Sequence, residues 1–219
     1  MSRITAYHQQ SPEELANTLA AAEQKYARLQ EAHRARNQPL DLTRGKPSDA
    51  QLDLADSLDG ILEGNYLSAD GIDTRNYGGL RGLREARELG QELLGISPEN
   101  IMAGGNSSLQ LMHDAAGFAR EVRWQNSQPT MLCPVPGYDR HFTLCEAHGL
   151  PMQPVALTPD GPDMDALEAL VAEDASVGGI WCVPRFSNPT GATYSDDVVQ
   201  RIANLPNKAR HENFVVFWD

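Results

Sequence analysis

The chain alternates between segments in which apolar residues recur at helical spacing and short runs that are continuously apolar. The first helical segment opens at Ser11-Pro12-Glu13-Glu14, where a serine N-cap precedes a proline at the first helical position and an acid at the third. Apolar residues then recur every three or four positions until the pattern fades at 37–39. We expect one amphipathic helix there, followed by a linker over 41–47.

Beyond the linker, predicted helices and strands take turns. We expect helices over 83–94, 109–122, 139–148 and 163–172, a further helix capped by Ser195, and strands over 101–103, 130–133, 152–157, 179–183 and 214–218. The apolar runs in the strand segments are continuous rather than alternating, as expected for strands that are buried on both faces. Strands that alternate with helices indicate βαβ units, so the sequence predicts an α/β fold with a mostly parallel sheet.

Composition narrows the function classes. The 219 residues carry a net charge of −12 and contain no basic run, which argues against a nucleic-acid partner. No stretch approaches the length of a membrane-spanning segment and no leader pattern is present, so we expect a cytoplasmic protein without a membrane partner. Cys133, Cys145 and Cys182 have neither CxxC nor metal-ligand spacing, which predicts buried reduced thiols and no metal site.

The loops that follow the strands hold the candidate chemistry, because ligands of open α/β sheets bind at the carboxyl ends of strands. Gly105-Asn106-Ser107-Ser108 opens a helix whose free N–H groups and hydroxyls suit a phosphate, although serine there is also a common helix cap. Tyr138 follows the second strand and either stacks on a flat ring or only packs. Asn188 follows the fourth strand, and Asp219 follows the fifth, where an acid is often only a turn residue.

In combination these segments are far more specific. Asn188-Pro189-Thr190-Gly191, with Asp219 closing a later apolar strand, resembles the class I/II aminotransferases of fold type I, which use pyridoxal 5'-phosphate (PLP). The segment 76–84, which contains Tyr77, is similar to the Tyr–Gly–Leu-Arg segment of that family. The resemblance covers essentially the whole chain and looks closest to a bacterial aspartate-aminotransferase-like branch. It implies a three-layer fold in which 1–50 belong to a small domain and 51–219 form the PLP-binding large domain.

The resemblance assigns roles around the cofactor ring. Asp219 would pair with the pyridinium nitrogen and keep it protonated, so that the ring accepts electrons from the substrate. Asn188 would donate a hydrogen bond to the phenolic oxygen of the ring. Tyr138 would stack on the ring, although the family more often places its aromatic residue where Val135 stands.

Further roles concern the phosphate and the neighbouring subunit. Asn106, Ser107 and Ser108, with nearby backbone N–H groups, would hold the cofactor phosphate at the helix N-terminus. Tyr77 would reach the phosphate bound by a neighbouring subunit, which implies a homodimer with shared sites.

Substrate roles follow in the same way. Gly45 and Lys46, together with Arg44 and Asn188, would lie on the side of the substrate carboxylate. The implied substrates are a small-molecule amino acid and a 2-oxo acid, with aspartate and 2-oxoglutarate as the best guess.

One expected residue has no match. The family's Schiff-base lysine lies after the aspartate, whereas this sequence has only Lys25, Lys46 and Lys208, so no catalytic residue is assigned. Lys208 precedes the fifth strand and is expected at the opposite end of the sheet from Asp219. We therefore expect a chain truncated before the last strands, marginally folded because of an open strand edge, and inactive alone.

Two other interpretations stay open. The chain could be a non-catalytic ligand-binding or regulatory module that keeps an aminotransferase-like fold. It could also be an unrelated α/β phosphate-binding protein, which would make the combination of Asn188 to Gly191 with Asp219 a coincidence.

Overall fold

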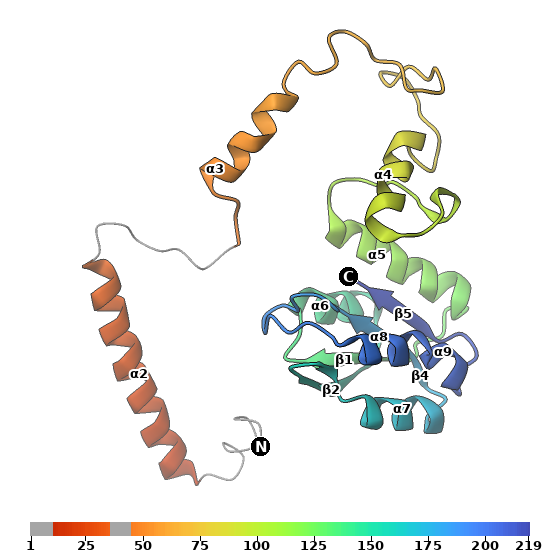
Figure 1. Ribbon diagram of the computed structural model, residues 1–219. Coiled ribbons are helices and arrows are strands. Elements are labelled where there is room, and N and C mark those ends of the chain that lie inside the picture. Colours follow the sequence, from red (N-terminus) through yellow and green to blue (C-terminus); the bar gives the residue numbers. More distant parts are fainter. Residues whose placement is uncertain (1–10, 36–44) are drawn as a thin grey trace. The chain divides into compact units, whose positions relative to one another are not determined.

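The computed structural model describes residues 11–35 and 45–219 and divides the chain into two compact units, 1–66 and 67–219 (Figure 1). The first unit contains the helices α2 (Pro12–Arg34) and α3 (Asp49–Leu52) and the 3-10 helix η1 (Asp53–Leu58). The second unit contains all strands of the described chain. A domain boundary after residue 50 stays a prediction.

Local capping defines the start of α2. The hydroxyl of Ser11 accepts a hydrogen bond from the Glu14 N–H at 3.3 Å, and the Glu14 carboxylate accepts one from the Ser11 N–H at 2.7 Å. These reciprocal bonds satisfy two backbone donors that a helix N-terminus otherwise leaves unpaired. The predicted start of this helix is therefore confirmed.

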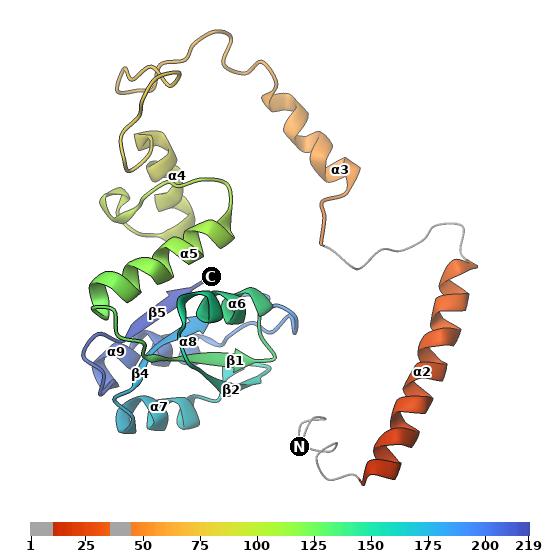
Figure 2. The ribbon, with the colours of Figure 1, turned by 180° about the vertical axis from the view of Figure 1, so that it is seen from behind.

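The second unit is an α/β structure with a five-stranded sheet (Figures 1 and 2). In chain order its elements are α4 (Arg84–Leu94), η2 (Pro98–Asn100), α5 (Ser108–Phe118), η3 (Ala119–Arg123), β1 (Thr130–Val135), α6 (Asp139–His148), β2 (Met152–Thr158), β3 (Gly161–Pro162), α7 (Met164–Glu173), β4 (Val177–Cys182), α8 (Asp196–Ala203), α9 (Leu205–Lys208) and β5 (Val215–Trp218). The strand order is β3-β2-β1-β4-β5, and only β3 runs antiparallel to its neighbour. The predicted mostly parallel sheet is confirmed.

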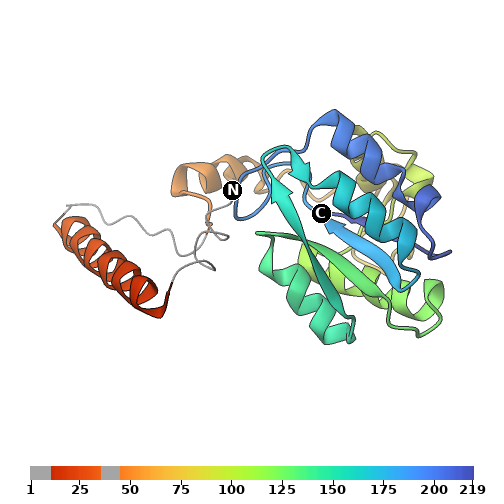
Figure 3. The same cartoon turned by 90° about the horizontal axis from the view of Figure 1, so that it is seen from below.

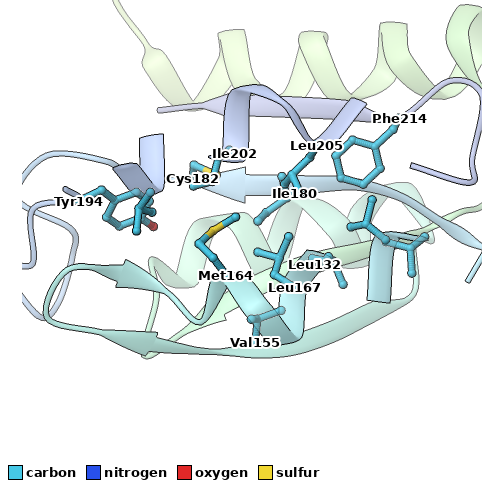
Figure 4. Packing of buried hydrophobic residues seen from close by; sticks show 13 residues of the cluster. Leu132, Val155, Met164, Leu167, Ile180, Cys182, Tyr194, Ile202, Leu205 and Phe214 are labelled. Atoms are coloured by element: carbon cyan, nitrogen blue, oxygen red, sulfur yellow. The ribbon is translucent and has the colours of Figure 1, made fainter. Parts of the chain in front are cut away.

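Helices cover both faces of the sheet and make it the middle of three layers (Figure 3). Successive side chains of a strand point to opposite faces. Leu132 of β1 accordingly packs with α7, α8 and α9, whereas Met131 and Cys133 pack with α5 and α6. Figure 4 shows the first of these cores, which includes Ile180 and Leu167. All three cysteines are buried free thiols, as predicted.

The main error concerns 101–103, which is not a strand. Ile101 is buried, but the Ala103 N–H bonds to the carbonyl of Arg81 at 3.0 Å in a loop. A strand needs a partner for its backbone groups, and none of the strands between 45 and 219 pairs with this segment. The short β3 was not predicted, because two residues carry no periodicity.

None of the helices within 11–35 and 45–219 is long and apolar enough to cross a membrane. Within those ranges, no group of three or more His, Cys, Asp and Glu side chains is placed to hold a metal ion.

Candidate active site

The carboxyl ends of β1, β4 and β5 bring the main candidate residues together. Asp219 directly follows β5, and its N–H donates to the carbonyl of Cys182 at 2.8 Å, so the backbone is held against β4. Val215 and Phe217 pack on the α5/α6 face of the sheet. Because side chains alternate along a strand, Asp219 extends the same row and its carboxylate emerges beside α6.

His141 of α6 meets that carboxylate. Its Nε2 lies 3.0 Å from Oδ2 of Asp219, and the imidazole is only 5% exposed while the Asp219 side chain is 27% exposed. Burial lowers the pKa of His141, and the hydrogen bond to the Asp219 carboxylate offsets this only in part. A neutral imidazole that faces a carboxylate carries its proton on Nε2 and donates it. Asp219 is thus oriented by a buried uncharged donor.

Aromatic rings surround His141. Tyr138, the N-cap of α6, approaches it edge-on, with ring centroids 5.2 Å apart and planes at 83°. Trp181 of β4 stacks on its other side at 4.6 Å and 11°. Tyr138, His141 and Trp181 line a pocket together with Gly137 and Ser187 from the loops after β1 and β4. Tyr138 therefore lies in the same pocket as His141 and Trp181.

The loop after β4 forms one wall of this pocket. The Gly191 N–H donates to the Ser187 carbonyl at 2.6 Å, and the Ser187 N–H donates to the Ala192 carbonyl at 2.8 Å. These bonds close a tight turn around Asn188. Ser187 is buried and faces the pocket, whereas Asn188 is exposed at the tip of the turn. The side-chain amide of Asn188 is therefore not packed in the core, and it follows a residue that lines the pocket.

The predicted phosphate segment forms the N-terminus of α5. The Ser107 hydroxyl accepts a hydrogen bond from the Gln110 N–H at 3.3 Å, so this serine is a helix cap. Asn106, Ser107 and Ser108 are all exposed. Ser107 also lines a hollow between α5 and α6 to which α6 contributes Arg140, a cation that sequence reasoning did not single out. The hollow combines helix N–H groups, hydroxyls and a guanidinium, which suits an anion.

The other predicted residues belong to other parts of the chain. Tyr77 is 99% exposed and its backbone N–H is held by the Asn76 side chain at 2.8 Å. Gly45 and Lys46 belong to the first unit, where they line a hollow with residues of α3. Arg44 lies outside the described residues. Lys208 pairs with Glu168 of α7 at 2.8 Å.

Sequence reasoning missed His141 and Trp181, which contact one another although they come from different elements. The one local signal was the three-residue spacing from Tyr138 to His141, which places both on one side of the first turn of α6. Taken together, the carboxylate offers a partner for a protonated nitrogen, the aromatic rings offer a stacking surface, and the N-terminus of α5 offers N–H donors for an anion.

The chain is similar to known proteins over most of its length. The family model described as aspartate amino-transferase matches residues 10–219. A putative aminotransferase of Mycolicibacterium smegmatis is 48% identical over 208 residues, which cover 90% of this chain and 47% of that protein. An aspartate aminotransferase of Corynebacterium glutamicum is 44% identical, over 85% of this chain and 44% of that protein.

Solved structures show the same likeness. A putative aminotransferase from Corynebacterium diphtheriae superposes with a TM-score of 0.78 at 40% identity, over 90% of this chain and 50% of that chain. An aspartate transaminase from Corynebacterium glutamicum gives a TM-score of 0.76 at 40% identity, over 96% of this chain and 50% of that chain. The chain spans about half the length of the relatives that it matches. The chain therefore belongs to the aspartate aminotransferase family.

Proposed function

We propose that this chain forms the first half of a PLP-dependent aminotransferase that exchanges an amino group between an amino acid and a 2-oxo acid. Aspartate and 2-oxoglutarate are the proposed substrates, on the strength of a relative named aspartate aminotransferase that is 44% identical. The observation that carries the proposal is the Asp219 carboxylate at the end of β5, held by the buried His141 at 3.0 Å.

Asp219 and His141 would tune the cofactor ring. Asp219 would accept a hydrogen bond from the ring nitrogen, and its negative charge would keep that nitrogen protonated. His141 donates to Oδ2, which leaves Oδ1 for the ring. PLP, when bound, supplies an electron sink for the bond that breaks at the substrate α-carbon.

The remaining contacts would hold the cofactor in place. Tyr138 would stack on the ring and Asn188 would donate to its phenolic oxygen. Asn106, Ser107 and Ser108 would bind the phosphate with the N–H groups of α5, where the helix dipole favours an anion.

Other residues would contact a neighbouring subunit and the substrate. Tyr77, which is 99% exposed, would reach the phosphate in a neighbouring subunit of a homodimer. Lys46, Gly45 and Asn188 would lie on the substrate carboxylate side, where the ammonium of Lys46 supplies a positive charge. In this proposal residues 1–50 belong to the small domain and 51–219 to the PLP-binding large domain of a cytoplasmic enzyme, a compartment that suits three free buried thiols.

The test uses the full-length protein. PLP is added to the purified protein, binding is followed by visible absorbance, and amino transfer from aspartate to 2-oxoglutarate is measured. We expect saturable PLP binding and transfer that depends on it. The variant Asp197→Ala, which changes an exposed acid of α8, should retain both PLP binding and amino transfer. A full-length protein that neither binds PLP nor transfers the amino group of any amino acid would refute the proposal.

A further inference from the structure

Trp181 occupies the centre of a stack of aromatic rings beneath the candidate site. It is 3% exposed on β4, where the strand register pairs it with Phe217 of β5. Its ring stacks on Phe217 at 4.3 Å and 21° and, on the other side, on His141 at 4.6 Å and 11°. The indole therefore lies between Phe217 of the sheet and the imidazole that contacts Asp219.

The indole N–H of Trp181 makes at most a weak polar contact in the core. Its Nε1 is buried and has no nitrogen or oxygen partner among the residues that the structure describes. The polar group beside it is the thiol of Cys145, which is a weak acceptor. The geometry therefore points to the flat face of the ring, which phenylalanine also offers, as the part of Trp181 that acts on His141.

The face of the indole sets the plane of the His141 ring. Rotation about the last side-chain torsion of histidine is normally soft. Here Trp181 covers one face of the imidazole and Tyr138 meets it edge-on, so rotation would break both contacts. In the plane that these two rings allow, Nε2 lies 3.0 Å from Oδ2 of Asp219.

We propose that Trp181 is a positioning residue, which acts through His141 to aim a neutral N–H at Asp219 and so to hold that carboxylate ready for the cofactor ring nitrogen. The role in cofactor binding rests on the proposed function. Burial under Trp181 and Tyr138 also lowers the pKa of His141, which keeps the donor uncharged near pH 7. The negative charge of Asp219 is then not cancelled by a neighbouring imidazolium.

The first test follows the His141 ring directly, in full-length protein without cofactor. Nitrogen NMR of ¹⁵N-histidine, assigned with a His141→Asn variant, distinguishes the Nε2–H tautomer, the Nδ1–H tautomer and the imidazolium. We expect the parent protein to show the neutral Nε2–H form at pH 7. Trp181→Leu should mix the tautomers and raise the pKa of His141, because water reaches the ring. Trp181→Phe should restore the parent signals.

Two further variants separate loss of the flat ring from a general loss of packing. Trp181→Met also lacks a flat face but is more flexible than leucine, so it should behave like Trp181→Leu. It serves in place of the leucine variant if that variant does not fold. Ile180→Ala removes a fully buried side chain from the same strand but on the opposite face of the sheet. It should lower stability and leave the His141 signals unchanged. Parent-like His141 signals in both the leucine and methionine variants would overturn the proposal.

The second readout is the affinity for PLP. We expect the dissociation constant to rise about tenfold in Trp181→Leu and Trp181→Met and to stay near the parent value in Trp181→Phe and Ile180→Ala. Equal weakening by Ile180→Ala would overturn the proposal, since it would reduce Trp181 to a packing residue. If the parent protein does not bind PLP at all, the proposed function fails, and the NMR result still decides whether Trp181 positions His141.

Discussion

Glu168 of α7 lies at the centre of an ion-pair network, and its neutralisation should remove an acid-sensitive part of the stability. Its carboxylate contacts Arg201 of α8 at 3.1 Å and Lys208 of α9 at 2.8 Å. The hydrogen bond from Arg201, followed by that from Lys208, lowers the pKa of Glu168 from 4.5 to about 2. The network thereby links the three helices that cover one face of the sheet.

The magnitude follows from the pKa. A difference between 4.5 and about 2 corresponds to about 3 kcal/mol at 1.36 kcal/mol per unit. Arg201 is 31% exposed and Lys208 46% exposed, so water screens both pairs. We therefore expect about 1 kcal/mol from Glu168. A depressed carboxyl pKa stabilises the fold above pH 4.5, and this contribution disappears as the pH falls from 4.5 to about 2.

The assay is urea unfolding at several pH values between 3 and 7, for the parent and for Glu168→Gln. The difference in unfolding free energy should be about 1 kcal/mol at pH 7 and should shrink steadily below pH 4.5. The control is Glu173→Gln on the same helix, because Glu173 makes no side-chain ion pair within residues 45–219. A difference for Glu168→Gln that stays constant with pH, or equals that of Glu173→Gln, would refute the reasoning.

Three more outcomes are expected. Asp219→Asn should lower kcat of the full-length enzyme by on the order of 10³-fold, because a neutral amide no longer keeps the ring nitrogen protonated; steady-state kinetics would expose an error if kcat changed less than tenfold. Ser107→Ala should cost about 1 kcal/mol in thermal or urea unfolding through loss of the α5 cap. It should also weaken PLP binding in a titration, and unchanged affinity would argue against a phosphate role. Leu167→Ala, at a site with 0% exposure, should cost about 2–5 kcal/mol, and an unchanged urea midpoint would contradict the packing of α7 on the sheet.

Much of the fold was predictable because short sequence patterns, namely apolar runs and helix caps, determine where its strands and helices begin. The runs that became β1, β2, β4 and β5 are mostly apolar, and Ser11 and Ser195 cap helices where the pattern places them. The segment 101–103 has the same apolar character, yet a strand exists only when another strand satisfies its backbone. That requirement is not visible in a three-residue pattern.

The candidate site was predictable in part for the same reason. Asp219 and Asn188 follow strands, so the rule that ligands bind at the carboxyl ends of strands finds them. His141 is separated from Asp219 by 78 positions, and the two meet only in the folded chain, where the first turn of α6 lies beside the residue that follows β5. Trp181 looked like ordinary strand core, and its stacking on His141 is a tertiary contact that no single segment encodes.

The order of the strands has a consequence for synthesis on the ribosome. β1 is the first strand to be made and lies in the middle of the sheet, with β2 on one side and β4 followed by β5 on the other. Every parallel strand that emerges later therefore finds a finished edge to pair with, and none has to wait for a partner not yet translated. The sheet can grow outward during translation, and β5, which emerges after the other four strands, delivers Asp219 to a His141 and a Trp181 already in place.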